Sequence, residues 1–257
     1  MVDAFIDSHC HLDFPELAEN IGEILTNMQR SGVTHALCVS VDLQKLPRLL
    51  QLVNDHPNLY ASVGIHPDYE LEVEPHQSEL IRLAQHPKVV AIGETGLDYY
   101  RLQGNLDWQR ERFRTHIRAA RACGKPLIIH TRSAAQDTLD IMAEEMAGEV
   151  GGVMHCFTEN LQIAEAAIAQ GFYISFSGIL TFKNAQQIKE VAQCIPLEKI
   201  LIETDSPYLA PAPYRGKINQ PAYVKHIAEE IARLRNISVA EVAKATSCNF
   251  NRLFLGK

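Results

Sequence analysis

The chain has 257 residues, of which 46% are hydrophobic and 21% are charged, and its formal net charge is −7. This length suits one large domain or two small ones with a substantial buried core. No apolar run approaches the ~20 residues that a membrane-spanning helix needs. The negative net charge argues against a long nucleic-acid-binding surface, because such a surface depends on many Lys and Arg contacts to phosphates. It still allows a small site that binds one or two phosphates.

The first residues, MVDAFIDSHCHLDF, lack the basic region and the apolar stretch of a signal peptide. The six cysteines are scattered, with no Cys-x-x-Cys pair, whereas a thiolate metal site needs clustered sulfurs. A chain of this size also does not need disulfides to be stable. We therefore expect a cytoplasmic protein without structural disulfides or a membrane partner.

Eight short apolar runs recur along the chain and predict β-strands. Each is too short for a helix, rich in Val and Ile, and apolar almost throughout, which is typical of parallel strands buried on both faces. In chain order the predicted strands are Ala4–Ser8, His35–Ser40, Tyr60–Ile65, Val89–Glu94, Pro126–Thr131, Gly152–Cys156, Phe172–Ser177 and Lys199–Asp205.

Amphipathic stretches between these runs predict helices. Asn20–Ser31, Leu106–Cys123 and Asn160–Gln170 are each followed directly by a glycine. A glycine just after the last periodic residue favours a left-handed helix stop. Pro221–Leu234 and Val239–Leu255 predict two further helices after the last strand.

Strands that alternate with helices indicate repeated βαβ units, which close either as a doubly wound open sheet or as an eight-stranded barrel. The first strand is not followed by the Gly-x-Gly-x-x-Gly motif of dinucleotide-binding open sheets. We therefore predict an α/β fold, a single (β/α)8 TIM-type barrel with additional C-terminal helices. No linker divides the chain, so one domain over 1–257 is expected.

Polar residues stand at the carboxyl ends of the predicted strands. In a (β/α)8 barrel these ends point to one face, where active sites are built. Buried strands favour apolar or small residues because an unpaired polar side chain costs a few kcal/mol. The polar residues are, in order, Ser8-His9-Cys10-His11, Ser40, His66, Glu94, His130, His155, Ser177 and Asp205.

His9 and His11 are two residues apart, so both imidazoles point the same way from an extended strand and can meet one metal ion. This spacing is weak support by itself, but later strands add further ligand types. Glu94 ends VVAIGE, and its two carboxylate oxygens could bridge two cations. His130 and His155 end the fifth and sixth strands, so they could hold a second ion beside Glu94.

Asp205 ends LIETD and could be a metal ligand, a general base, or both, because a carboxylate bound through one oxygen can accept a water proton through the other. Glu203, two residues earlier, should face the same side. It could contact a metal ligand from behind, act as an auxiliary base, or be a barrel-interior partner for a basic or polar group.

Arg132 follows His130 by two residues and could bind a phosphate with both guanidinium nitrogens, or form a structural ion pair instead. His66, in VGIHP, could contact the substrate or protonate a leaving group. Weaker candidates for substrate contact lie in later loops, namely Tyr99, Lys183, Arg215 and Lys217.

These residues lie in segments that resemble the TatD-type metal-dependent deoxyribonucleases, a hydrolase family within the amidohydrolase-like barrels. The resemblance covers essentially the whole chain. The matching segments are FIDSHCHLD, VGIHP, IGETGLDYY, PLIIHTRSAAQDTL, HCFT, FYISFSGILTFKNA, LIETDSPYLAP and RGKINQP.

The resemblance implies a ligand set that this chain matches at all six positions. His9, His11, Glu94 and Asp205 would hold one divalent ion, and Glu94, His130 and His155 the second. Related barrels bridge their metals with a carboxylated lysine, but a glutamate ends the fourth predicted strand here and no lysine ends any of the eight. This favours the TatD-like branch over dihydroorotase-like or phosphotriesterase-like relatives.

The sequence thus predicts a divalent-metal-dependent hydrolase that cleaves phosphodiester bonds. The resemblance implies DNA, degraded from an end, and the acidic composition suits short single strands better than long duplex. We expect the chain to act as a monomer. Two alternatives stay open: a hydrolase of the same metal chemistry that acts on an amide, lactone or deaminase substrate, and a non-catalytic metal-stabilised scaffold. The ions could be Zn, Mn, Mg, Ni or Fe.

Overall fold

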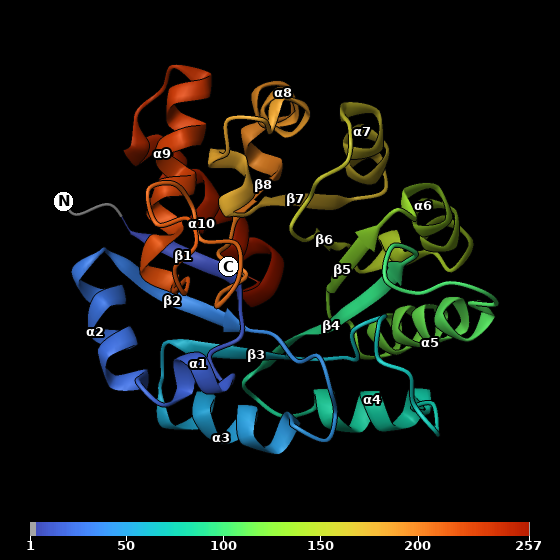
Figure 1. Cartoon of the computed structure of the whole chain (residues 1–257). Coiled ribbons are helices and arrows are strands. Elements are labelled where there is room, and N and C mark those ends of the chain that lie inside the picture. The colour runs from blue at the N-terminus through green and yellow to red at the C-terminus, as the bar shows by residue number, and fades with distance from the viewer. Residues whose placement is uncertain (1–3, 257) are drawn as a thin grey trace.

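The computed structural model describes residues 4–256, so residues 1–3 and 257 of the predicted domain lie outside the described part. Eight parallel strands form one sheet in the order β1 to β8, and helices surround it (Figure 1). The predicted (β/α)8 barrel is therefore confirmed. The strands are β1 Phe5–Cys10, β2 Val33–Cys38, β3 Leu59–Val63, β4 Val89–Asp98, β5 Leu127–Arg132, β6 Gly152–Met154, β7 Phe172–Phe176 and β8 Ile200–Ile202.

The barrel closes between β1 and the segment that follows β8. The amide of Asp205 donates to the carbonyl of His9 (2.9 Å), and the amide of His11 donates to the carbonyl of Ser206 (2.8 Å). Cys10 and Ser206 form an isolated parallel bridge between the same two segments. The two ends of the sheet are thereby joined at the carboxyl side of the barrel.

The helices lie outside the ring of strands, except for the last helix of the chain, which lies across one end of the barrel. Both predicted C-terminal helices are present, the first as a 3-10 turn that continues into an α-helix. No helix within residues 4–256 is long and apolar enough to cross a membrane. The helices are α1 Pro15–Ala18, α2 Ile21–Arg30, α3 Leu46–Asp55, α4 Gln77–Ala84, α5 Asp107–Cys123, α6 Ala135–Glu144, α7 Leu161–Ala169, α8 Gln186–Cys194, α9 Val224–Arg235 and α10 Val239–Leu255, with 3-10 turns η1 Ala147–Glu149, η2 Gly178–Thr181, η3 Leu197–Lys199 and η4 Pro221–Tyr223.

Three strand boundaries differ from the prediction in ways that matter for the polar residues. β6 ends at Met154, so His155 follows the strand and does not lie within it. β4 continues past Glu94 to Asp98 because residues Thr95 to Asp98 still pair with β5, so Glu94 lies inside a strand and not at its end. β8 ends at Ile202, and Asp205 stands beyond it with a left-handed backbone (φ 55°), a conformation that Asp adopts more readily than most residues.

The barrel interior changes from apolar to polar along its axis. At the amino end, inward-facing residues of β1, β2 and β4 to β8 form a buried apolar cluster with Phe250 and Phe254 of α10, which lies across this end. Above it come small hydroxyl side chains: Ser8 hydrogen-bonds to Ser175 (3.2 Å) and to the carbonyl of Ile202 (3.0 Å). The histidines and carboxylates follow at the carboxyl end, so α10 excludes water from the end opposite the polar residues.

One face of α5 anchors the loop after β3 through three buried polar side chains. His116 accepts a hydrogen bond from the amide of Ile65 (3.2 Å) and donates to the carbonyl of Arg112 (2.8 Å). Arg112 donates to the carbonyl of Tyr69 (2.5 Å), and Gln109 donates to the carbonyl of Pro67 (2.9 Å). This loop carries His66, so α5 sets the position of that histidine.

Replacing Phe250 by alanine should lower the free energy of unfolding by about 3–5 kcal/mol, because a buried aromatic side chain leaves a cavity at the base of the barrel. Chemical denaturation measures this loss. Lys244→Ala, at an exposed position of the same helix, is the matched control and should change stability little. Equal effects of the two substitutions would contradict the contribution of Phe250 to the apolar core at the amino end of the barrel.

His116 should make stability depend on pH. Burial lowers the pKa of His116 from 6.5 to about 4, so in this window the unfolded chain binds a proton that the folded chain does not. Stability should therefore fall as pH decreases from 6.5 to 4, by about 2 to 3 kcal/mol for this group. The test compares wild type with His116→Gln by denaturation at several pH values. An equally steep pH dependence in the variant would contradict the assignment.

Candidate active site

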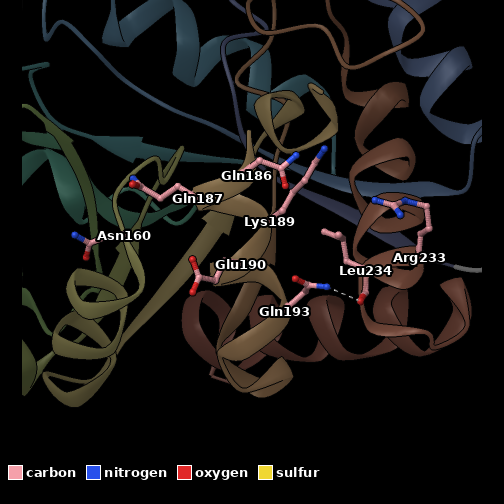
Figure 2. A pocket seen from close by; sticks show the side chains of 8 residues that line it. All are labelled: Asn160, Gln186, Gln187, Lys189, Glu190, Gln193, Arg233 and Leu234. Atoms are coloured by element: carbon pink, nitrogen blue, oxygen red, sulfur yellow. Dashed lines mark hydrogen bonds between the residues drawn. The ribbon is translucent and has the colours of Figure 1, made fainter. Parts of the chain in front are cut away.

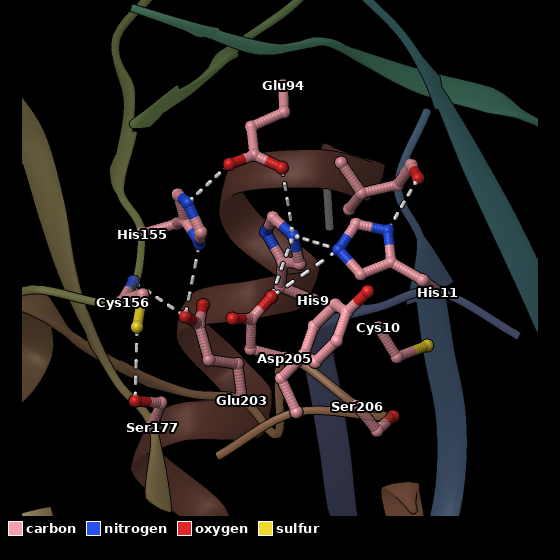
Figure 3. Close-up of polar contacts among 12 residues, drawn as sticks. His9, Cys10, His11, Glu94, His155, Cys156, Ser177, Glu203, Asp205 and Ser206 are labelled. Atoms are coloured by element: carbon pink, nitrogen blue, oxygen red, sulfur yellow. Dashed lines mark hydrogen bonds and ion pairs between the residues drawn. The ribbon is translucent and has the colours of Figure 1, made fainter. Parts of the chain in front are cut away.

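The six predicted metal ligands meet at the carboxyl end of the barrel, although they come from β1, β4, β5 and the segments after β1, β6 and β8. Figure 3 shows His9, His11, Glu94, His155 and Asp205 directed toward one another. His130 completes the set from β5, with its Nδ1 atom 3.1 Å from Glu94. All six are buried or nearly so, which is unusual for charged side chains unless they pair or bind metal.

A first group of donor atoms surrounds His9. Its Nε2 atom lies 3.3 Å from His11 Nε2, 3.6 Å from Asp205 Oδ1 and 3.5 Å from Glu94 Oε2. His11 Nε2 lies 3.4 Å from the same Asp205 oxygen. Ligands about 2.1 Å from a tetrahedral ion stand about 3.4 Å apart. The spacing of these atoms therefore fits one divalent cation.

A second group surrounds the other oxygen of Glu94. Its Oε1 atom lies 2.7 Å from His155 Nε2 and 3.1 Å from His130 Nδ1, and these two nitrogens are 3.3 Å apart. His66 Nε2 approaches the same oxygen at 3.4 Å. Imidazole nitrogens around a carboxylate oxygen are donors that suit divalent transition metals. Glu94 therefore presents one oxygen to each group.

Two of the histidines are oriented from behind by a second hydrogen-bond partner, and a third has a carboxylate within ion-pair distance. His11 Nδ1 donates to the carbonyl of Val39 (3.1 Å), and His130 Nε2 donates to Asp98 (3.1 Å). His155 Nδ1 lies 3.3 Å from Glu203. Such contacts select the nitrogen that faces the ion and hold the ring plane. His9 is held differently, since its ring stacks on that of His155 with centroids 4.1 Å apart.

The carboxylates of the cluster are ionised at neutral pH. Burial raises the pKa of Glu94, but His155, His66 and His130 together hold it well below its usual range. The pKa of Asp205 is likewise raised by burial and lowered further by His11 and His9, with a net decrease. The two carboxylates favour positive charge in this cluster, which is the charge that a divalent cation supplies.

Asp98 is similarly charged. Burial raises its pKa, but hydrogen bonds from His130 and from the amides of Arg101 and Tyr100 lower it to about 2. Its Oδ1 atom accepts from both amides at 3.0 Å. Asp98 is therefore a fixed anion behind His130.

The cluster opens into a cavity of about 640 Å³, whose lining includes the predicted residues His66 and Arg132. His66 is hydrogen-bonded to Asp68, which also pairs with Arg101 at 2.6 Å. The Arg132 guanidinium lies 3.9 Å from the ring centroid of Tyr100. Within residues 4–256, no carboxylate lies within ion-pair distance of Arg132, so the structural ion pair considered above is not formed.

Glu203 lies deeper than Asp205 and does not line the cavity. It is fully buried and accepts a hydrogen bond from the amide of Cys156 (2.6 Å) in addition to its contact with His155. It therefore contacts the barrel interior and the back of a histidine. The remaining loop candidates, Tyr99, Lys183, Arg215 and Lys217, also lie outside the cavity lining.

Asp98 and Arg101 both contribute to the cavity wall, and neither was predicted from the sequence. Asp98 could have been found, because it follows Glu94 by four residues and alternate strand residues share a face. It was overlooked because the predicted strand ended at Glu94. Arg101 lies in a loop, and its approach to Asp68 depends on the path of the chain after β3, for which the local sequence has no signal.

A second hollow, of about 650 Å³, lies outside the barrel. It is formed mainly by side chains of α8 with the end of α9 (Figure 2) and shares no residue with the cavity at the carboxyl end. Its lining mixes amides with residues of both charges, and Lys189 and Arg233 there already contact Glu230 at 3.7 Å and 2.8 Å. Of these two hollows in residues 4–256, the one at the carboxyl end contains the histidine and carboxylate cluster.

Comparison with known proteins agrees with this geometry. Residues 6–255 match the family model described as TatD related DNase. The chain is 44% identical to the uncharacterized metal-dependent hydrolase YcfH of Escherichia coli strain K12, over 97% of this chain and 95% of that protein. It is 31% identical to a protein of Escherichia fergusonii named 3'-5' ssDNA/RNA exonuclease TatD, over 96% of this chain and 98% of that protein.

Solved structures show the same likeness. The crystal structure of YJJV, a TatD homolog from Escherichia coli K12, superposes with a TM-score of 0.90 at 28% identity and covers 99% of both chains. A TatD family hydrolase from Entamoeba histolytica has a TM-score of 0.88 at 25% identity, with 100% of both chains covered. The matched family, the full-length relatives and the shared barrel agree, and the chain therefore belongs to the TatD family of metal-dependent hydrolases.

Proposed function

We propose that this protein is a nuclease that hydrolyses phosphodiester bonds in single-stranded DNA, from an end, with two divalent metal ions. The observation that carries the proposal is the position of Glu94, whose two oxygens face two separate groups of histidine nitrogens. A carboxylate in that position can bridge two cations and reduce their mutual repulsion. Two adjacent cations are a recurrent arrangement for phosphodiester cleavage.

His9, His11, Glu94 and Asp205 would hold the first ion. The second would be held by Glu94, His130 and His155. When bound, such ions lower the pKa of a water and neutralise charge on phosphoryl oxygens. Glu203 and Asp98 would keep the rings of His155 and His130 in place, so Glu203 is a positioning residue in this proposal.

Asp205 is the proposed general base. Its Oδ1 atom faces His9 and His11, and its Oδ2 atom is the oxygen that would accept the proton. The side chain is 16% exposed and lines the cavity, so Oδ2 can accept a proton from a water there. Its lowered pKa keeps the carboxylate ionised and able to accept that proton.

Arg132, Arg101 and His66 would bind and orient the phosphate. Arg132 lacks an acidic partner in the described chain, and its stacking on Tyr100 holds the guanidinium plane at the cavity wall. A guanidinium held in this way can donate two parallel hydrogen bonds to a phosphate. His66 contacts Asp68 through Nδ1, and its Nε2 faces Glu94, so it is placed to donate to a phosphate oxygen or to the leaving group.

Several observations support single-stranded nucleic acid as the substrate. The family is described as a DNase family, and one relative is named an exonuclease for single-stranded DNA and RNA. A cavity of about 640 Å³ is on the scale of a small ligand, which suits one or two nucleotides at the end of a strand better than a continuous duplex. The net charge of −7 likewise disfavours binding along a long duplex.

The central prediction is metal-dependent cleavage of single-stranded DNA that is lost in Asp205→Asn. Removing a ligand that also serves as general base should lower kcat by at least about 100-fold. The assay follows a labelled oligonucleotide with Mg²⁺, Mn²⁺, Zn²⁺ or Co²⁺. Asp107→Asn, at an exposed carboxylate of α5, is the matched control and should retain full activity.

Two results would contradict the nuclease proposal. The first is a wild-type protein that binds metal but cleaves no phosphodiester with any of these ions. Turnover of an amide, lactone or deaminase substrate under the same conditions would then identify the rival hydrolase. The second is unchanged activity in Asp205→Asn, which would place the general base elsewhere.

Asp98→Asn should weaken metal binding by about 10- to 100-fold, because His130 loses the anion that orients it. Isothermal titration of the metal-free protein with Zn²⁺ or Mn²⁺ measures this change. Asp137→Asn is a suitable control, since Asp137 pairs with Tyr99 outside the cavity (2.8 Å). If both variants bind metal as tightly as wild type, Asp98 does not orient a ligand.

A further inference from the structure

Tyr208 is an exposed aromatic side chain on a firmly held backbone. Its relative exposure is 53%, and of the large apolar side chains exposed in residues 4–256, it alone lines the cavity. Its amide donates to the carbonyl of Asp205 (3.0 Å), and Asn219 donates to the carbonyl of Tyr208 (2.6 Å). The backbone that carries the ring is therefore held in place, whereas the ring itself packs against few other side chains.

The same segment is pressed against η2. A Cβ atom at Gly178 would lie 1.9 Å from the carbonyl oxygen of Leu209, so only glycine allows this approach. The buried amide of Asn219 also donates to the carbonyl of Thr204 (2.9 Å). These contacts hold the backbone on both sides of Tyr208 and so explain where the ring lies. They give no structural reason for the exposure of the ring to solvent.

Phe14 forms a second aromatic surface beside Tyr208. Its ring stacks on that of His11, with centroids 4.7 Å apart and an interplanar angle of 19°. The rings of Phe14 and Tyr208 meet edge to face, with centroids 6.3 Å apart. Both side chains line the cavity. They border the first ligand group, because Phe14 lies on His11 and Tyr208 follows Asp205 by three residues.

The cationic residues of the cavity lie near the other ligand group. Arg132 follows the ligand His130 by two residues, and Arg101 pairs with Asp68, the partner of His66. The cavity thus has aromatic rings on the side of the first ligand group and the guanidinium of Arg132 on the side of the second, with the histidine and carboxylate cluster between them. A nucleotide has the same division, with a flat apolar base at one end and an anionic phosphate at the other.

We propose that Tyr208 and Phe14 form a stacking subsite for the base of the nucleotide whose phosphate reaches the cluster. The inference rests on the proposed nuclease function and adds to it a subsite that accepts any base, because every base has a π face. Stacking also supplies affinity without positive charge, which matters for a chain with a net charge of −7.

The test compares two ligands that differ only in the base. The metal-loaded full chain is titrated calorimetrically with 2′-deoxyadenosine 5′-monophosphate and with 2-deoxyribose 5-phosphate. Wild type should bind the nucleotide about 10-fold more tightly, a typical effect of stacking one base on an aromatic side chain. Tyr208→Ala should lose most of this preference and bind the sugar phosphate as wild type does. Tyr208→Phe, which keeps the ring without the hydroxyl, should retain the preference.

A cleavage assay gives an independent readout. Single-stranded oligonucleotides with a normal or an abasic terminal nucleotide are compared, and Tyr208→Ala should raise KM for the normal substrate only. If wild type shows no preference for the base, or if Tyr208→Ala weakens both ligands equally, the stacking subsite is wrong while the nuclease proposal stands. If wild type binds neither phosphate and cleaves neither substrate, both proposals fail.

Discussion

Two backbone hydrogen bonds close the barrel, and the candidate active site depends on them. The amide of Asp205 reaches the carbonyl of His9, and the amide of His11 reaches the carbonyl of Ser206. Residues that are almost 200 positions apart in the sequence become neighbours through this closure. Because both bonds flank the histidine pair, His9, His11 and Asp205 cannot separate unless the barrel opens between its first and last strands. A hydrogen bond of this kind contributes about 1 kcal/mol to stability, but here it also sets ligand geometry.

The barrel can accommodate the polar cluster because the polarity of its interior increases from the amino end to the carboxyl end. Apolar residues fill the amino end under α10, serine hydroxyls follow, and the histidines and carboxylates come last. Glu94 and Asp205 each lie within ion-pair distance of histidines, and His130 and His155 each have a carboxylate behind them. An isolated carboxylate at this depth would cost several kcal/mol. The same arrangement that satisfies Glu94 in the folded chain makes it suitable as a bridge between two cations.

The contacts that support the site come from the outer helices and loops as well as from the strands. Gln109, Arg112 and His116 hold the loop after β3 from one face of α5. Asn219 and Gly178 hold the segment that carries Asp205 and Tyr208. The side chains of the cavity wall are therefore carried on backbone that is hydrogen-bonded to rigid elements. Under the proposed function, this fixed wall would bind the small, flexible end of a nucleic acid.

The sequence by itself determined the repeating strand and helix pattern, the barrel class and the residue types at the carboxyl ends of the strands. These are local properties, since apolar runs, glycine stops and the i, i+2 spacing of His9 and His11 act over a few residues. It also indicated Glu94, His130, His155 and Asp205 as candidates, because polar residues in buried strands are unusual.

The tertiary structure decided what those residues can do. It placed Glu94 inside β4 and not at its end, because pairing with β5 continues to Asp98. Glu203 lies behind His155, Asp98 behind His130, and Tyr100 beneath Arg132. Each of these relations joins segments that are neighbours only after the strands have taken their places around the barrel. Distances between such segments follow from register and closure, which no short stretch of sequence encodes.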